Sequence, residues 1–153
     1  MESRKILFAF ALLLSSGILC FSQTTNRPAK TEQNLTVQSV RSSAAYAEIL
    51  LKKTELQSDL ESLLLEYTDE HPKVNEIRFV LGSIQKEADR IFAAKPSEAS
   101  KLTVALGKLI IRKVELETDL WSLLRNYKDD HPDVKRAKRK VEIYEAAIKE
   151  ILL

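Results

Sequence analysis

The stretch KTELQSDLESLLLEYTDEHPKV occupies residues 53–74, and a second version of it, KVELETDLWSLLRNYKDDHPDV, occupies residues 113–134. Thirteen of the 22 positions are identical in the two versions. Each version runs from a leucine-rich segment into a Tyr-x-Asp-x-His-Pro step. Proline fits the first position of a helix and disfavours helical geometry in the residue before it. We therefore interpret each version as the end of one helix, a tight turn and the start of a second helix.

Mostly apolar residues, with one lysine in each copy, flank both turns at alternating steps of three and four, which is the spacing of helices packed side by side. In the first copy they are Tyr46, Ile49, Lys53, Leu56, Leu60, Leu63 and Tyr67, then Val74, Ile77, Leu81, Ile84, Ala88 and Ile91. In the second copy they are Ala99, Leu102, Leu106, Leu109, Lys113, Leu116, Leu120, Leu123 and Tyr127, then Val134, Ala137, Val141, Tyr144, Ile148 and Ile151. Four helices are predicted.

The predicted fold is all-α, with two tandem antiparallel helical hairpins that are coiled-coil-like and span residues 42–95 and 96–153. An up-down-up-down order of the four helices places both His-Pro turns at the same pole. Ser42 or Ser43 is expected to cap the first helix, and Ser97 the third. Two alternatives stay open: one long helix kinked at Pro96, or an extended pair of hairpins that buries its apolar stripes only by oligomerising.

The N-terminus has the pattern of a secretory signal peptide over residues 1–22, because a short positive region precedes an unbroken apolar run. Cleavage is predicted after Ser22. The alternatives are a retained membrane anchor or a lipoprotein lipidated at Cys20. Residues 23–41 are predicted to form a flexible polar leader, since they carry too few apolar residues to offset chain entropy. A chain cleaved after Ser22 contains no cysteine, so its stability must come from packing.

Composition argues against several classes of function. Charged residues make up 30% of the chain and nearly balance, at a net charge of +2, so no overall charge favours nucleic acid as a partner. The sequence contains no nucleophile–base pattern, phosphate-binding loop or metalloprotease signature. We predict a non-enzymatic protein without a cofactor.

The repeated turn is the most distinctive candidate site. Its residues are Tyr67, Asp69, His71 and Pro72 in the first copy and Tyr127, Asp129, His131 and Pro132 in the second. If both turns meet at one pole, Asp69, His71, Asp129 and His131 offer the ligand types that a divalent transition metal accepts. The favoured interpretation is turn chemistry alone, with the aspartates near free amides and the histidines before a helix-opening proline.

Two further features concern charge within the helices. Lys53 and Lys113 occupy apolar seam positions, where a polar side chain can specify register. Lys53 is predicted to pair with Glu87, and Lys113 to reach a different partner or water. Trp121 stands where the first copy has Glu61, and it is expected to seal the second hairpin or mark a contact surface.

A basic block follows the second turn. It comprises Lys135, Arg136, Lys138, Arg139 and Lys140. Such a block can bind anionic polysaccharide or lipid headgroups by charge. It is more often the solvated face of an amphipathic helix, which is the favoured interpretation here.

The tract at residues 63–74, LLLEYTDEHPKV, and its copy at residues 123–134 resemble a helical segment of the bacterial polysaccharide co-polymerase (chain-length determinant) family. In that family a tyrosine and a His-Pro-x-Val step precede a heptad helix of the extracytoplasmic coiled coil. The protein is expected to depart from the family in three respects, which are the absence of a second membrane span, the absence of a kinase domain, and a cleaved N-terminus. The resemblance implies a bacterial envelope coiled-coil module, and it does not imply control of polysaccharide length.

We therefore expect an exported structural or protein-interaction protein of the bacterial envelope, either periplasmic or secreted. Its expected partners are another copy of itself or another coiled-coil protein, with membrane contact only through an uncleaved N-terminus or a lipidated Cys20. The alternative function is a small binding protein for anionic envelope polysaccharide or lipid through the basic block.

Overall fold

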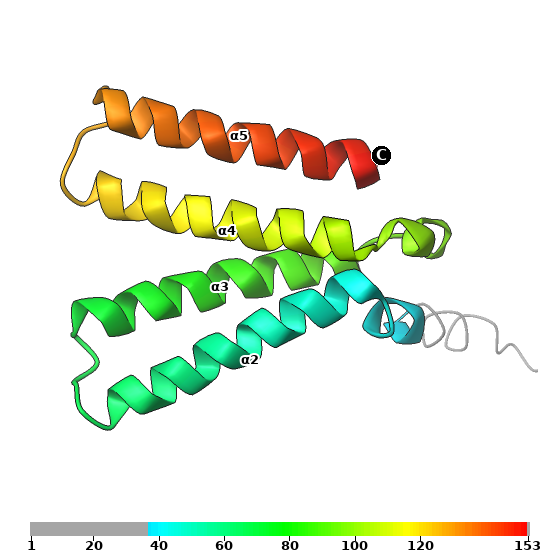
Figure 1. Cartoon of the computed structure of the whole chain (residues 1–153), viewed down its shortest axis with the longest axis horizontal. Coiled ribbons are helices and arrows are strands. Elements are labelled where there is room, and N and C mark those ends of the chain that lie inside the picture. The colour runs from blue at the N-terminus through cyan, green and yellow to red at the C-terminus, as the bar shows by residue number, and fades with distance from the viewer. Residues whose placement is uncertain (1–36, 153) are drawn as a thin grey trace, which may run out of the picture.

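The computed structural model describes residues 37–152 and shows an all-helical chain (Figure 1). The four long helices are α2 (Ala44–Leu64), α3 (Pro72–Phe92), α4 (Val104–Leu124) and α5 (Pro132–Leu152). A short 3₁₀ helix, η1 (Pro96–Lys101), links the two hairpins. Each long helix has 21 residues, and each helix of the second hairpin begins and ends 60 positions after its counterpart in the first. The predicted pair of duplicated antiparallel hairpins is confirmed.

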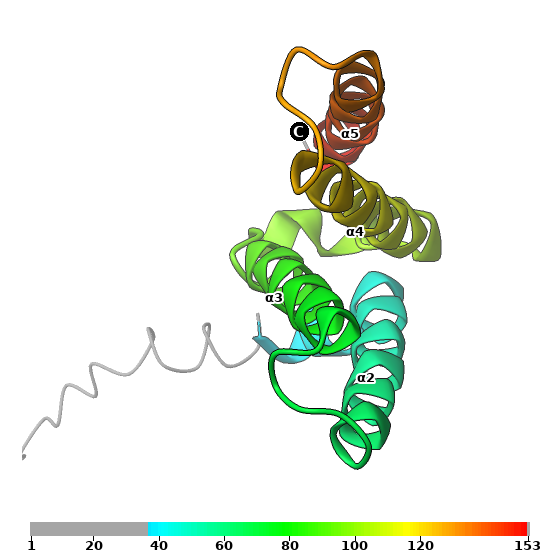
Figure 2. The same cartoon turned by 90° about the vertical axis from the view of Figure 1, so that its left-hand side faces the viewer.

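The helices alternate in direction, and both His-Pro turns lie at one pole of the molecule, at the left of Figure 1. The antiparallel course of α3 and α4 rules out a single helix kinked at Pro96. Figure 2 shows the hairpins as layers, with α4 above α2 and α3, and α5 above α4. α4 contacts both helices of the first hairpin, whereas α5 packs chiefly on α4, with a smaller contact to η1.

Local chemistry sets where the helices begin. Ser43 caps α2 by accepting a hydrogen bond from the Tyr46 backbone N–H, as predicted. α4 begins later than expected, because Pro96 opens only a 3₁₀ turn and Thr103 supplies the cap, accepting from the Leu106 N–H. Ser97 therefore does not cap the long helix of the second hairpin.

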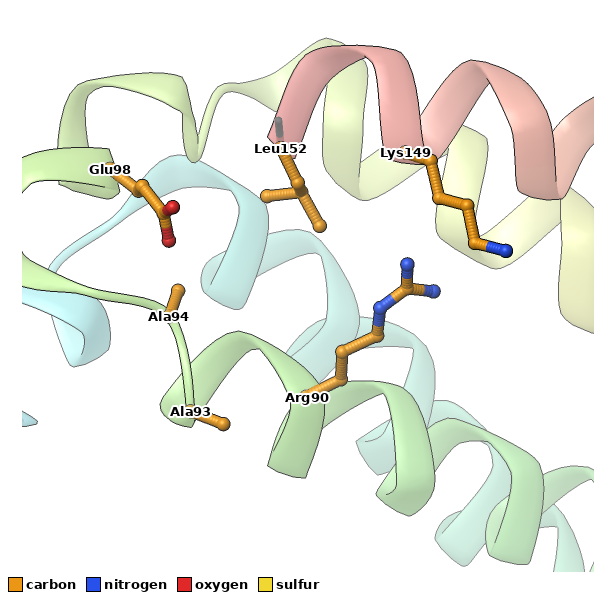
Figure 3. Close-up of a pocket in the computed structure, with 6 residues that line it drawn as sticks. All are labelled: Arg90, Ala93, Ala94, Glu98, Lys149 and Leu152. Atoms are coloured by element: carbon orange, nitrogen blue, oxygen red, sulfur yellow. The ribbon is translucent and has the colours of Figure 1, made fainter.

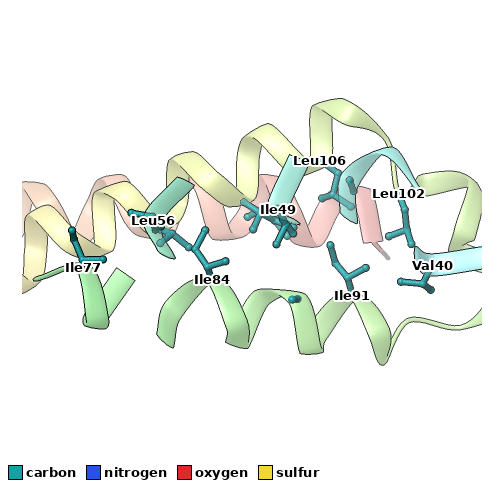
Figure 4. Close-up of a cluster of buried hydrophobic side chains, with 13 residues drawn as sticks. Val40, Ile49, Leu56, Ile77, Ile84, Ile91, Leu102 and Leu106 are labelled. Atoms are coloured by element: carbon teal, nitrogen blue, oxygen red, sulfur yellow. The ribbon is translucent and has the colours of Figure 1, made fainter. Parts of the chain in front are cut away.

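The two hairpins share one apolar core. Most of its buried side chains come from α2, α3 and α4, while Val40 and Leu102 come from the segments before α2 and α4, and Ile148 from α5 (Figure 4). The Ala45 backbone N–H donates to the Leu102 carbonyl at 3.1 Å, so the first turn of α2 is tied to the segment that precedes α4. This bond satisfies a donor that a helix start leaves free.

The packed region begins before the predicted boundary at residue 42. Residues 37–41 are helical, and Val40 belongs to the buried core. The predicted leader of residues 23–41 therefore extends too far at its C-terminal end, because Val40 is buried in the core. The predicted signal peptide and Cys20 lie outside the described residues. None of the helices in residues 37–152 has the length and hydrophobicity of a membrane span.

Candidate functional site

The two His-Pro turns have the same construction. The Tyr67 and His71 rings lie 4.1 Å apart between centroids, and the Tyr127 and His131 rings lie 4.2 Å apart. His71 Nδ1 accepts a hydrogen bond from the Lys73 N–H at 3.3 Å, and His131 Nδ1 accepts from the Asp133 N–H at 3.2 Å. Each histidine therefore caps the helix that its proline opens, and the tyrosine stacks on the histidine.

The capping role predicts the effect of substitution at His71. His71→Ala should lower the free energy of unfolding by about 1 kcal/mol, because the Lys73 N–H loses its acceptor. His71→Asn should retain most of the stability, since an amide oxygen is a good helix cap. Urea denaturation of both variants makes the comparison. Equal losses in the two would show that the capping bond contributes nothing measurable.

The aspartates and histidines considered as metal ligands at this pole make other contacts within the chain. Asp69 pairs with Arg78, and Asp129 pairs at the equivalent position with Lys138 at 2.9 Å. Among the described residues no group of three or more His, Cys, Asp or Glu side chains is placed to hold a metal ion. Asp69, His71, Asp129 and His131 are therefore not brought together as a ligand set, because each hairpin closes its own turn internally.

A buried cluster of charges joins three helices near the middle of the stack. Lys113 on α4 and Glu87 on α3 are 7% and 6% exposed, and Lys113 Nζ lies 2.5 Å from Glu87 Oε1. Glu145 on α5 contacts the same ammonium at 3.1 Å, and Glu117 contacts it at 3.3 Å. Glu87 Oε2 accepts no hydrogen bond, although Arg90 Nη1 lies 3.6 Å away. Lys113 thus connects both hairpins.

The predicted Lys53–Glu87 pair is wrong. Lys53 Nζ donates instead to Gln85 Oε1 at 2.7 Å. This contact is the counterpart of Lys113 with Glu145, because each pair is separated by 32 residues and joins the helices of one hairpin. The partner of Lys53 thus lies two residues before the predicted one, and Glu87 faces the second hairpin instead.

The cluster favours the charged forms of its members. Burial disfavours the Lys113 ammonium, but the hydrogen bonds to Glu87 and Glu145 and the nearby carboxylate charges outweigh it, so its pKa is raised. Burial likewise disfavours the Glu145 carboxylate, but hydrogen bonds from Lys113 and Arg90 outweigh it, so its pKa is lowered.

The free energy of unfolding should therefore depend on pH at both the acidic and the alkaline end of the pH range. The lowered pKa of Glu145 gives a contribution that is fully present above the ordinary carboxyl pKa and is lost as the pH falls through the lowered value. The raised pKa of Lys113 gives a contribution that is lost only as the pH rises through that raised value. In Glu145→Gln, the free energy of unfolding should fall less steeply between about pH 5 and pH 3 than in the wild type. Glu142→Gln, at an exposed site, is the matched control and should keep the wild-type slope.

Three of the five residues of the basic block form ion pairs with carboxylates of the same chain. Arg136 pairs with Asp133, Lys138 with Asp129, and Arg139 with Glu142. The block lies on α5 and is largely exposed, which agrees with the solvated face of an amphipathic helix. Its neighbours reduce the positive charge available to an anionic polymer, so binding of polysaccharide or lipid stays a prediction.

Two pockets adjoin the charge cluster. The first, of about 350 Å³, lies at the pole opposite the His-Pro turns and is lined by Arg90, Ala93, Ala94, Glu98, Lys149 and Leu152 (Figure 3). Its two cations both contact Glu145, at 3.1 Å from Arg90 and 3.6 Å from Lys149. Their charge is therefore shared with a protein carboxylate.

The second pocket, of about 420 Å³, lies between α3 and α4 beside the Lys113–Glu87 pair. It is closed on one side by Phe79 and Trp121, whose rings stack with centroids 4.9 Å apart. Arg125 lies over the Trp121 ring at 5.1 Å. Trp121 therefore lies at the contact between the two hairpins, which agrees with the predicted contact surface and not with the alternative of a seal within the second hairpin. No signal in the sequence identified Phe79 as its partner.

The outer helices carry exposed apolar side chains. Leu50 and Leu51 on α2 and Ile143 on α5 are the largest examples within the outer helices, with Leu65 just beyond the end of α2. We take these exposed leucine and isoleucine side chains as candidate contact surfaces.

Comparison of the chain with protein-family models, curated proteins and solved structures finds no match in any of the three. The resemblance to the polysaccharide co-polymerase family therefore stays a prediction.

Proposed function

We propose that the chain is an exported, non-enzymatic structural or protein-interaction module of the bacterial envelope, which acts through the uncovered faces of its outer helices. The observation that carries the proposal is the one-sided packing of the stack. α5 packs chiefly on α4, and Ile143 on α5 is 54% exposed. A face of this kind buries its apolar side chains only when a partner covers it.

The polar groups of the described chain support the same proposal. The histidines cap helices, the turn aspartates pair with cations on the following helix, and the buried lysine neutralises carboxylates from two neighbouring helices. These contacts stabilise the fold and position the outer helices. They leave surface recognition as the activity that best fits the geometry.

Export is proposed from the sequence of residues 1–22. Mass spectrometry of the protein isolated from the cells that produce it should give a mature chain that begins at Gln23. A chain that begins at a lipidated Cys20 would place the protein on a membrane as a lipoprotein. An intact Met1 on protein recovered from the cytoplasm would contradict export.

Site-specific photo-crosslinking tests the interaction role. A photoreactive amino acid at Ile143, in the producing cells, should give adducts of higher mass, because that side chain is exposed on the uncovered face. The matched control is the same amino acid at Asp89, an exposed polar position on α3. Absence of adducts from Ile143 and from Leu50 would overturn the proposed function.

A further inference from the structure

The two hairpins are equivalent in their contacts as well as in their sequence. A shift of 60 positions converts Tyr67–His71 into Tyr127–His131, Asp69–Arg78 into Asp129–Lys138, and Lys53–Gln85 into Lys113–Glu145. The first hairpin and its neighbour therefore show how one unit of this kind packs on the next. In repeat proteins each unit contacts only its neighbours, so a unit at either end has one neighbour fewer than an internal unit.

The face of α4 that meets the first hairpin is well defined. Gly107 is buried, and a Cβ atom there would lie 2.9 Å from the Glu48 Cβ and 3.0 Å from the Ala45 carbonyl oxygen. Ile110 is 1% exposed, and Trp121 stacks on Phe79. This face of α4 thus fits into the first hairpin along most of its length.

The counterpart of that face on α2 is uncovered. Shifting back by 60 positions gives Ala47, Leu50 and Glu61 in place of Gly107, Ile110 and Trp121, and all three are exposed. Leu50 is 46% exposed, whereas its counterpart is buried. We call the exposed side chains of Ala47, Leu50, Thr54, Gln57 and Glu61 the α2 face.

The receiving surface is uncovered as well. On α3, Phe79 and Ser83 line the pocket against α4, and their counterparts on α5 are Arg139 and Ile143. On α2, Glu48 approaches α4, and its counterpart on α4 is the exposed Lys108. We call the side chains of Lys108, Arg139 and Ile143 the α4–α5 face.

We infer that a second copy of this chain docks head-to-tail, its α2 face on the α4–α5 face of the first, in the way that α4 docks on the first hairpin. The inference rests on the proposed interaction role and names the partner. The partner is a second copy because the two surfaces that pack together within the chain each have an equivalent surface that is uncovered. These uncovered equivalents are the α2 face at one end of the stack and the α4–α5 face at the other. Such a contact is heterologous, so it leaves a free face on each side of every pair.

Charge complementarity supports this occupant. Within the chain the contact is closed by two aromatic residues, Phe79 and Trp121. Their counterparts on the open faces are Arg139 and Glu61, which carry opposite charges and are both exposed. Head-to-tail docking places Glu61 of one copy opposite Arg139 of the next. The open faces therefore carry a charged pair where the buried contact has the aromatic pair. Charged side chains remain hydrated when the two faces are apart, and they attract each other when the faces meet.

The contact between copies is looser than the contact within the chain. Ala47 carries a methyl group where Gly107 has none, so α2 cannot approach as closely as α4 does. Ala147 replaces Glu87, so the buried ion pair is not repeated. These differences make a contact that forms and separates, in contrast to the permanent one between the hairpins.

Sedimentation velocity of the exported protein, over about 1–300 µM, tests the inference. The wild type should show a mass that rises with concentration beyond the dimer. Leu50→Lys and Ile143→Glu should each weaken association at least 10-fold, because a charge replaces the apolar side chain on one face. Asp89→Lys, on the exposed side of α3, is the control and should associate like the wild type. Circular dichroism should show the same helix content in all variants.

A mixture of the two single-face variants gives the decisive result. Leu50→Lys retains an intact α4–α5 face, and Ile143→Glu retains an intact α2 face, so an equimolar mixture should form a 1:1 dimer that grows no further. Symmetric pairing of two α2 faces or two α5 faces would leave one variant unaffected and give no rescue, which overturns the inference. A wild type that stays monomeric to 300 µM also overturns it.

Charge reversal provides an independent readout. Glu61→Arg and Arg139→Glu should each weaken association several-fold. The double variant should recover it, because the arginine at position 61 of one copy then lies opposite the glutamate at position 139 of the next. No recovery in the double variant contradicts the assigned register. If the wild type is monomeric but photo-crosslinking at Ile143 captures another protein, head-to-tail docking fails while the interaction role stands.

Discussion

Lys113→Met is expected to lower the free energy of unfolding by about 3–5 kcal/mol, the loss that follows removal of one partner from a buried ion pair. The ammonium lies 2.5 Å from Glu87 Oε1, and both side chains are buried. Methionine matches the length of the lysine stem but leaves the Glu87 carboxylate without its main counter-charge. Glu145 retains Arg90 at 3.1 Å, so the loss concentrates on Glu87. Urea denaturation at pH 7 measures the effect.

The duplication supplies the control for this prediction. Lys53 is the counterpart of Lys113, but its contact is to an exposed, neutral Gln85. Lys53→Met should therefore change stability by less than about 1 kcal/mol. The double variant Lys113→Met with Glu87→Leu should recover most of the loss, because an apolar pair of similar volume replaces a buried ion pair at little cost. Equal effects of the two single lysine substitutions would refute the assignment of Lys113 as the buried link.

Gly107→Ala should destabilise the protein, although alanine is the better helix former. The new methyl group would meet the Glu48 Cβ at 2.9 Å and Ala45 backbone atoms at 3.0 and 3.1 Å. None of these atoms is the mobile end of a long side chain, so α2 and α4 must move apart. Overpacking of this kind costs about 1–3 kcal/mol, against a gain of about 1 kcal/mol in helix propensity. We expect a net loss of up to about 2 kcal/mol by thermal or urea denaturation.

Gly82→Ala is the matched substitution in α3. A Cβ atom at Gly82 would meet nothing within 4 Å, so only the propensity gain applies. This variant should be more stable than the wild type by about 1 kcal/mol. The two glycines should thus respond in opposite directions. A stabilised Gly107→Ala would mean that α2 and α4 are not in close contact at this point.

Much of the architecture was predictable from local sequence. Pro72 and Pro132 open helices, Ser43 caps α2, and the seam spacing marks the helical segments. The helix ends were less predictable. α2 ends at Leu64, so Tyr67, the last residue of the predicted seam before the first turn, lies beyond the helix and stacks on His71. α4 begins at Val104 because Thr103 is a better-placed cap than Ser97.

The candidate surfaces were less predictable than the helices. Trp121 and the basic block were recognisable as unusual, but their partners were not. Phe79 is one apolar residue among many on its helix, and only the structure places it against Trp121. Val40 stands in a polar stretch, where nothing in its neighbours indicates that it enters the core.

The sequence by itself determined four helices, two equivalent turns and a duplication of 60 residues, because these features depend on interactions within a few positions along the chain. Only the tertiary structure decided which helix faces which. The spacing of apolar residues defines a stripe on each helix, but it does not say which neighbour covers that stripe. Sequence spacing therefore did not show that Glu87 pairs with Lys113 across the hairpins. Nor did it show that Leu50 and Ile143 remain exposed, although the equivalent positions in the other hairpin lie at the contact between the hairpins.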